Sequence, residues 1–207
     1  YRVLKLRLAL EYTFFEQSKF YGKNQHGMFF VNDKGEKEVK KGLTERVLKF
    51  VKTCNDLGMY ELSERGLSPN KYYSEWLEIA KNTTNHLGEN LKINFLIPPS
   101  NDFKGKGSEG LVDGNRGYKD FNINWIGWYG TNAEFEILTQ KLDFSTLKIN
   151  FLEDQRHWIF KPKKIKVYGF QNQKWKLIKE ENLENLTETN EITTQSWELS
   201  STSFSNF

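Results

Sequence analysis

Three aromatic residues in the segment NWIGWYG are the first candidates for binding chemistry. They are Trp125, Trp128 and Tyr129. A pyranose ring has a flat C–H face that stacks on an indole ring, while nearby polar side chains bond its hydroxyl groups. The alternative role is core filling, because tryptophan is highly buried on average. In a strand, Trp125 and Trp128 would point to opposite faces, so one could lie in the core while the other contacts a ligand.

A second group of polar residues lies between two apolar runs in the stretch FLEDQRHWIF, where Glu153, Asp154, Arg156 and His157 precede Trp158. We expect this group to occupy a solvent-exposed connection between strands, where charge costs little. Trp158 is expected to pack back over the end of the sheets. Glu153, Arg156 and His157 could then contact sugar hydroxyls or an adjoining domain. Alternatively, Asp154 and Arg156 form an ion pair that holds the loop, which is the ordinary role of such pairs.

The segment LVDGNRG predicts a tight turn. In such a turn the carboxylate of Asp113 accepts hydrogen bonds from nearby backbone N–H groups, and Gly114 allows the sharp change of direction. Arg116 follows at once and is a polar candidate to stand beside one of the tryptophans.

Other kinds of chemistry find little support. The single cysteine, Cys54, excludes an internal disulfide and a cysteine-based zinc site. The histidines do not have metal-ligand spacing, and no nucleophile elbow, phosphate loop or triad spacing is present. Carboxylates are abundant, but nothing in the sequence pairs an acid with a nucleophile as a glycosidase requires. We therefore expect no glycoside hydrolysis by this chain alone.

Composition narrows the class of protein further. The 207 residues suffice for one large domain or two small ones. The net charge of +3 is too weak to indicate a nucleic-acid partner. No apolar run reaches the roughly 18 residues of a transmembrane helix. The first residue is Tyr1 and no signal peptide is visible, so we expect a fragment or a processed chain.

The elements that must position these residues differ between the two halves of the chain. Helical spacing of apolar residues predicts helices over 43–57, with Thr44 as N-cap and Gly58 just past the end, and over 69–81, with Ser68 as N-cap. Residues 3–20 fit a strand or a helix, and we favour a helix. The segment MFFVNDKGEKEVK predicts a hairpin. From residue 91 the period changes to two, which predicts short antiparallel strands with turns between them.

Three segments resemble a known family. The segment LVDGNRGYKDFNINWIGWYG and the segment FLEDQRHWIFKPKKIKVYG resemble the galactose-binding-like β-sandwich, of the discoidin or hexosaminidase C-terminal type, that is appended to many bacterial glycoside hydrolases. The first half, from LTERVLKF to LKINFLIPPS, is similar to the region before that sandwich in large secreted hydrolases of polysaccharide-degrading bacteria. The activity of that last family is itself undefined.

The resemblance implies an α+β fold, with a mainly helical segment over 1–90 and an antiparallel galactose-binding-like sandwich (jelly roll) over 91–207. It also implies that the protein is secreted, periplasmic or on the cell surface in bacteria, and that a catalytic domain lies upstream. Related modules often bind a structural calcium ion at the turn, which makes Asp113 the candidate ligand, with Asn115 and Asp120 as helpers. The plain turn without metal is the alternative. Such a sandwich should continue past residue 207, so we expect a fold truncated at its C-terminus.

Three functions remain open. The chain is the non-catalytic C-terminal part of a polysaccharide-degrading glycoside hydrolase whose sandwich binds carbohydrate, or it is a structural accessory that docks on the catalytic domain without binding sugar. In the third, residues 1–90 form a wall of the active site of the whole enzyme. An exposed tryptophan in a concave surface would favour the first function. An apolar helical face left exposed would favour the other two.

Overall fold

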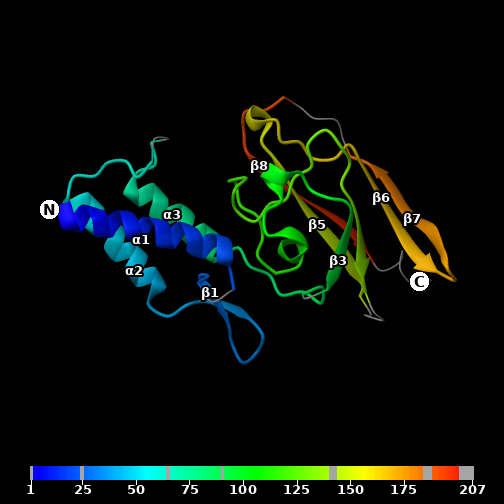
Figure 1. Ribbon diagram of the computed structural model, residues 1–207, viewed down its shortest axis with the longest axis horizontal. Coiled ribbons are helices and arrows are strands. Elements are labelled where there is room, and N and C mark those ends of the chain that lie inside the picture. Colours follow the sequence, from blue (N-terminus) through cyan, green and yellow to red (C-terminus); the bar gives the residue numbers. More distant parts are fainter. Residues whose placement is uncertain are drawn as a thin grey trace.

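The computed structural model describes residues 2–23, 26–63, 66–89, 91–139, 144–183 and 188–200. The last residues of the predicted second domain, 201–207, lie outside this part of the chain. Helices lie at one end of the molecule with a short hairpin beside them, and the strands that follow residue 91 lie toward the other end (Figure 1). Helices are α1 (Arg2–Tyr21), α2 (Leu43–Asp56) and α3 (Pro69–Ala80), and strands are β1 (Phe29–Val31), β2 (Lys37–Val39), β3 (Lys92–Ile97), β4 (Glu134–Leu138), β5 (Thr146–Glu153), β6 (Lys164–Gln171), β7 (Lys174–Asn182) and β8 (Thr193–Ser200).

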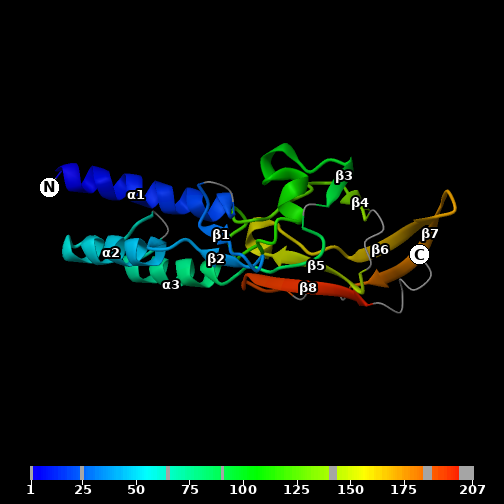
Figure 2. The same ribbon diagram turned by 90° about the horizontal axis from the view of Figure 1, so that it is seen from below.

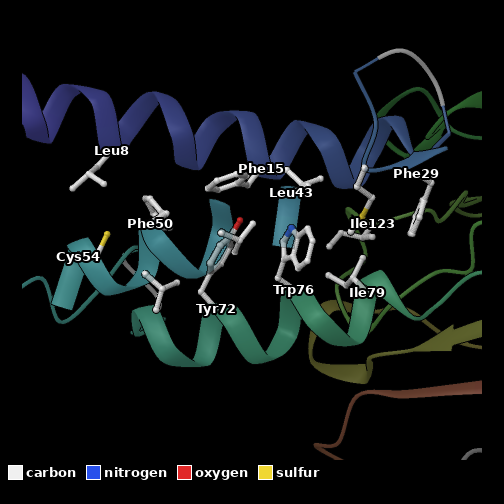
Figure 3. Close-up of a cluster of buried hydrophobic side chains, with 13 residues drawn as sticks. Leu8, Phe15, Phe29, Leu43, Phe50, Cys54, Tyr72, Trp76, Ile79 and Ile123 are labelled. Carbon is white, nitrogen blue, oxygen red and sulfur yellow. The ribbon is translucent and has the colours of Figure 1, made fainter. Parts of the chain in front are cut away.

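The helices share one aromatic core. Phe15 of α1, Phe50 of α2 and Tyr72 and Trp76 of α3 are at most 2% exposed. Their side chains fill the space between α1 and the layer of α2 and α3 (Figure 3). Phe15 and Phe50 meet edge to face, with ring centroids 5.5 Å apart, which is the arrangement that aromatic quadrupoles favour. Apolar residues at helical spacing therefore produce the three helices by burying their stripes together.

The ends of the helices follow local rules with one exception. Ser68 caps α3, and its hydroxyl accepts a hydrogen bond from the backbone N–H of Lys71, as predicted. Gly58 lies just past α2 with a φ of 67°, also as predicted. The prediction of Thr44 as N-cap is wrong, because α2 begins at Leu43 after Gly42, whose φ of 78° turns the chain into the helix.

Helix α1 carries apolar residues on two faces. Leu8 and Phe15 are buried against the other helices. A second stripe faces solvent, and its members, named the α1 stripe below, are Val3, Leu6, Leu10 and Phe14, which are 81%, 67%, 73% and 37% exposed. Figure 2 shows α1 on one side of the core, with α2 and α3 on the other. The double pattern explains why the sequence of this segment also fitted a strand.

The strands of the second half are antiparallel, as predicted, and they form two-stranded sheets: β3 pairs with β4, β5 with β8, and β6 with β7. The mixture of helix and antiparallel strand is thus confirmed. Among the described residues these sheets do not join into a closed sandwich. The segment NWIGWYG is not a strand but part of the long connection between β3 and β4.

The two faces of the β5–β8 sheet have different environments. One face packs on the β6–β7 hairpin through Ile165, Trp197 and Leu199, all less than 9% exposed. The other face presents polar residues, because Asn150 lies opposite Ser196 and Thr194 follows two positions away. This polar face is directed toward the end of α3.

The joint between the two halves is a short antiparallel contact. Thr83, just after α3, pairs with Asn115 of the β3–β4 connection. The backbone N–H of Thr84 donates to the carbonyl of Gly114 at 2.9 Å. Gly114 admits no side chain here, because an added Cβ would lie 2.6 Å from the Thr84 carbonyl oxygen. The joint therefore holds the residues after Gly114 against the C-terminal end of α3.

Candidate functional site

A pocket of about 300 Å³ lies where α3, the β3–β4 connection and the polar face of β5–β8 meet. Two of the aromatic and basic residues singled out in the sequence, Arg116 and Trp125, line it. The remaining lining residues are Glu78, Lys81, Asn82, Gly117, Tyr118, Lys119, Asn150, Thr194 and Ser196. The pocket is open to solvent on one side and combines one indole ring with amides, hydroxyls and charged groups.

Trp125 is held in the pocket wall by its neighbours. Its indole Nε1–H donates to the carbonyl of Tyr118 at 2.6 Å. The ring lies directly against the backbone of Gly117, because a Cβ added there would fall 2.1 Å from Trp125 Cε2. The side chain is half-buried, so it is fixed in position and keeps part of its surface at the pocket. Asn124, with a φ of 59°, turns the chain so that Trp125 faces this way.

Arg116 projects from a backbone that is bound on both sides. Its N–H donates to the carbonyl of Asn82 at 3.1 Å, and its own carbonyl accepts from Asn124 Nδ2 at 3.2 Å. Asn82 Nδ2 donates to the carbonyl of Gly117 at 2.8 Å. The guanidinium is exposed and forms no ion pair within the described ranges. A ligand can therefore use this group without breaking an internal contact.

Hydrogen-bonding groups cover the other walls. Ser196 Oγ donates to Asn150 Oδ1 at 2.6 Å, which leaves the Asn150 amide N–H₂ available to an incoming oxygen. Tyr118 Oη donates to Glu78 Oε2 at 2.5 Å. Burial and this hydrogen bond raise the pKa of Tyr118 far above its ordinary value, so the phenol stays neutral. The walls thus offer donors and acceptors of the kind that bind hydroxyl groups.

The other aromatic candidates of NWIGWYG lie elsewhere. Trp128 packs against both Phe95 and Phe135, with ring centroids 5.8 and 6.4 Å away, and its Nε1–H donates to the carbonyl of Ile97 at 2.8 Å. It fills the space beside the β3–β4 sheet. Tyr129 follows at 81% exposure and does not line the pocket. Trp125 and Trp128 do lie in different environments. They lie in a loop, however, so the prediction that they occupy opposite faces of a strand is wrong.

The EDQRHW segment forms the end of β5 and a 3₁₀ turn over Gln155–His157. Glu153 and Asp154 are 5% and 3% exposed, so the prediction that the whole segment is wet is wrong. Asp154 Oδ2 lies 2.6 Å from His157 Nδ1, and Asp154 Oδ1 lies 3.8 Å from Arg156 Nε, which confirms the predicted ion pair. The Asp154 carboxylate thus holds the turn through its contacts with Arg156 and His157.

Trp158 does not pack back over the sheets. It is 82% exposed and adopts a left-handed backbone with a φ of 60°, which directs its ring away from the molecule. His157 stacks at a tilt on Phe121, with ring centroids 5.5 Å apart, so the turn lies against the same connection that forms the pocket. Arg156, His157 and Trp158 therefore form a second exposed cluster outside the pocket.

The turn at Asp113 has the geometry of the plain Asx turn. Asp113 Oδ1 accepts from the backbone N–H of Asn115 at 2.9 Å, and Oδ2 is in contact with the ammonium group of Lys106. The amide of Asn115 is buried against Gly22. Asp120 accepts from the backbone N–H of Asn122 in an Asx turn of its own. A lysine in contact with Asp113, the main candidate ligand, fits a calcium site poorly, because the ammonium occupies the position of the cation.

Within the ranges described, no group of three or more His, Cys, Asp and Glu side chains is arranged to hold a metal ion. A span across a membrane also finds no support, because none of the helices in the described residues is long and apolar enough.

Sequence reasoning missed most of the pocket. The sequence does not predict a role for Lys81, Asn82 or Lys119, because single polar residues near the end of a helix or in a loop are common. Asn150 and Ser196 lie on the polar face of β5 and β8. The alternation of polar and apolar residues predicts such a face, but it does not predict which part of the chain lies opposite. A further exposed apolar group on the β6–β7 hairpin could have been found from the alternation on both sides of the turn; its members are Tyr168, Phe170, Trp175 and Leu177.

Searches of protein-family models, of curated proteins and of solved structures found no match to this chain.

Proposed function

We propose that this chain is the non-catalytic C-terminal part of a polysaccharide-degrading glycoside hydrolase, and that it binds carbohydrate in the pocket beside Trp125. The observation that carries the proposal is the meeting of Trp125 and Arg116 with the amide and hydroxyl groups of Asn82, Asn150 and Ser196 in one concave site. The galactose-binding-like sandwich and the secreted, periplasmic or cell-surface location belong to the same proposal and rest on the sequence resemblance.

The chemistry of a sugar fits this arrangement. The apolar face of a pyranose can lie on the indole of Trp125, whose orientation is already fixed by the bond to Tyr118 and by the contact with Gly117. Hydroxyl groups on the ring edge can then exchange hydrogen bonds with Asn150 and Ser196 on one wall and with Arg116 on another. Since the ring of Trp125 moves little on binding, little conformational entropy is lost.

The experiment is a pull-down and calorimetric titration against a panel of plant, algal and bacterial polysaccharides. We expect Trp125→Ala and Arg116→Ala each to weaken binding, by about 1–3 kcal/mol for the tryptophan. Trp158→Ala is the matched control, because this residue is 82% exposed and lies outside the pocket. Loss of binding only in Trp158→Ala would move the site to the 3₁₀ turn and contradict the pocket. A wild-type protein that retains no glycan would contradict sugar binding altogether.

A second function, a structural accessory that docks on the upstream catalytic domain, is favoured by the α1 stripe. Val3, Leu6 and Leu10 each expose two thirds or more of their surface on one helical face. An apolar stripe of this kind is typical of a surface that another protein segment covers. The upstream domain of the same polypeptide is the partner that this function requires.

The test of docking uses the full-length natural protein. We expect the double variant Leu6→Gln, Leu10→Gln to lower the melting temperature of an upstream domain while leaving glycan binding by the pocket unchanged. The control is Leu48→Gln, because Leu48 is 48% exposed on α2 rather than in the stripe. Equal melting of the two variants would contradict docking through α1.

A further inference from the structure

The charges around the pocket are unequal. Three cationic side chains, Lys81, Arg116 and Lys119, line it, and none of them forms an ion pair with another described residue. One carboxylate, that of Glu78, lines it as well, and its Oε2 accepts the hydrogen bond from Tyr118. Some cations elsewhere in the same half have partners, since Lys106 pairs with Asp113, and Lys164 and Lys166 pair with Glu180. The pocket thus gathers three cations and one carboxylate, which is an excess of positive charge.

From this charge distribution we propose that the ligand of the pocket is an acidic glycan, one whose sugar carries a carboxylate or a sulfate group. This inference rests on the proposed function and adds the chemical class of the sugar. An acidic group can be bound by Arg116 through two parallel N–H donors, which matches a planar carboxylate or two oxygens of a sulfate. Lys81, at the C-terminal end of α3, and Lys119 supply positive charge on either side.

The neutral groups of the site are consistent with the same ligand. Trp125 offers a stacking face for the ring that carries the acidic group, and Asn150 and Ser196 lie on the opposite wall, from β5 and β8. The carboxylate of Glu78 repels an acidic ligand, although the hydrogen bond from Tyr118 disperses part of its negative charge. Because Glu78 is not part of a cationic pair, its removal should favour an acidic ligand and leave a neutral one unaffected.

The experiment compares binding of the whole chain to three probes: polygalacturonate for carboxylate, κ-carrageenan for sulfate, and a neutral galactan. We expect one of the two acidic probes to bind at least about tenfold more tightly than the galactan, as expected for charge-assisted hydrogen bonds. Which acidic probe binds distinguishes carboxylate from sulfate. Binding to the neutral galactan with equal or higher affinity would overturn the acidic class while leaving carbohydrate binding intact. Absence of binding to every glycan would overturn both.

Charge-matched variants separate a site from general attraction to a basic protein. The triple variant Lys81→Gln, Arg116→Gln, Lys119→Gln should lose at least about tenfold in affinity for the acidic probe. The control is Lys34→Gln, Lys163→Gln, Lys174→Gln, which removes the same charge from exposed lysines outside the pocket. We expect Glu78→Gln to strengthen binding of the acidic probe alone. Equal losses in the two triple variants, or equal binding of poly-glutamate, would overturn the proposal.

Discussion

At the residue scale, Gly117 is the position on which the shape of the pocket depends most. The Trp125 indole lies where a side chain at Gly117 would stand, with 2.1 Å between an added Cβ and Trp125 Cε2. No rotamer of a flexible neighbour can relieve this contact, because the indole is itself held by the bond to Tyr118. A glycine at this point is therefore part of the site, although it contributes no functional group.

We expect Gly117→Ala to displace Trp125 and to destabilise the fold by about 1–3 kcal/mol, as other overpacked sites do. The intrinsic tryptophan fluorescence should shift and glycan binding should fall with it. Gly88→Ala is the control, since an added Cβ there would meet only side-chain atoms at 3.0 Å or more, His86 Nδ1 at 3.0 Å and Leu91 Cδ1 at 3.7 Å. The measurement is chemical denaturation of both variants, and equal stability would show that Trp125 does not depend on Gly117.

Asp113 carries the second prediction at this scale. Both carboxylate oxygens have partners, the Asn115 N–H and the Lys106 ammonium group. We therefore expect the same melting temperature with calcium and with chelator. Asp113→Asn, which keeps the acceptor of the Asx turn, should be milder than Asp113→Ala, which costs about 1 kcal/mol or more because the turn loses its acceptor. A calcium-dependent rise in melting temperature that Asp113→Asn abolishes would restore the metal site.

At the scale of elements, the helices and strands could be predicted because their signals are local. Ser68 starts α3 by accepting a hydrogen bond from a free backbone N–H, and Pro69 fits the first helical position because it has no N–H to leave unpaired. Both signals can be read without the rest of the chain. The pocket could not be predicted in this way. Lys81, Arg116 and Asn150 meet only because β5 pairs with β8 and the joint at Thr83 brings the β3–β4 connection to α3. Such pairing depends on long-range packing, for which one sequence carries no periodic signal.

The same reasoning explains two wrong predictions. Trp158 was expected to pack back over the end of the sheets, but it is 82% exposed, with a left-handed backbone at this residue. Glu153 and Asp154 were expected to be solvent-exposed because they were placed in the connection between two strands. They are buried because β5 continues through Glu153, and side chains of Gln155, Gln195 and His157 supply their hydrogen bonds. For Glu153 and Asp154, contacts formed in the folded chain decided the environment.

The cap of α3 gives a prediction that belongs to this scale. Ser68→Ala removes the acceptor for the Lys71 N–H, at 3.2 Å, and should cost about 1 kcal/mol of stability. Ser68→Asp should retain that stability, since aspartate is an equally good cap. Ser74→Ala, in the exposed interior of α3, is the control and should change stability by less than about 0.5 kcal/mol. Thermal melting of the three variants tests this. A Ser68→Ala protein as stable as the wild type would show that the cap contributes nothing.

At the scale of the whole molecule, one carboxylate ties the hairpin to the joint between the two halves. Glu89 lies between the ammonium groups of Lys23 and Lys37, and the Lys37 side chain is only 1% exposed. Lys37 also donates to the carbonyl of Thr84 at 3.1 Å, next to the bond from Thr84 to Gly114. The segment that carries Arg116 and Trp125 is therefore anchored, through Thr84 and Glu89, to Lys23 just after α1 and to the β1–β2 hairpin.

This anchor should make stability depend on pH. Burial alone would raise the pKa of Glu89, but the hydrogen bonds from Lys37 and Lys23 outweigh it and hold the pKa below its ordinary value of 4.5. A carboxyl whose pKa is lowered by folding adds stability that is fully present above its ordinary pKa and is lost as the pH falls through the lowered pKa.

We expect Glu89→Gln to cost about 3 kcal/mol at neutral pH, because it leaves the Lys37 ammonium buried without its counter-charge. The loss of stability below about pH 4.5 should also be shallower in this variant than in the wild type. Glu180→Gln is the control: its carboxylate pairs with Lys164 and Lys166 on the solvent-exposed β6–β7 hairpin, so salt screens the pair and its removal should matter far less. Denaturant unfolding at several pH values measures both effects, and a Glu89→Gln protein with wild-type stability and an unchanged acid limb would show that the two halves are joined by other contacts.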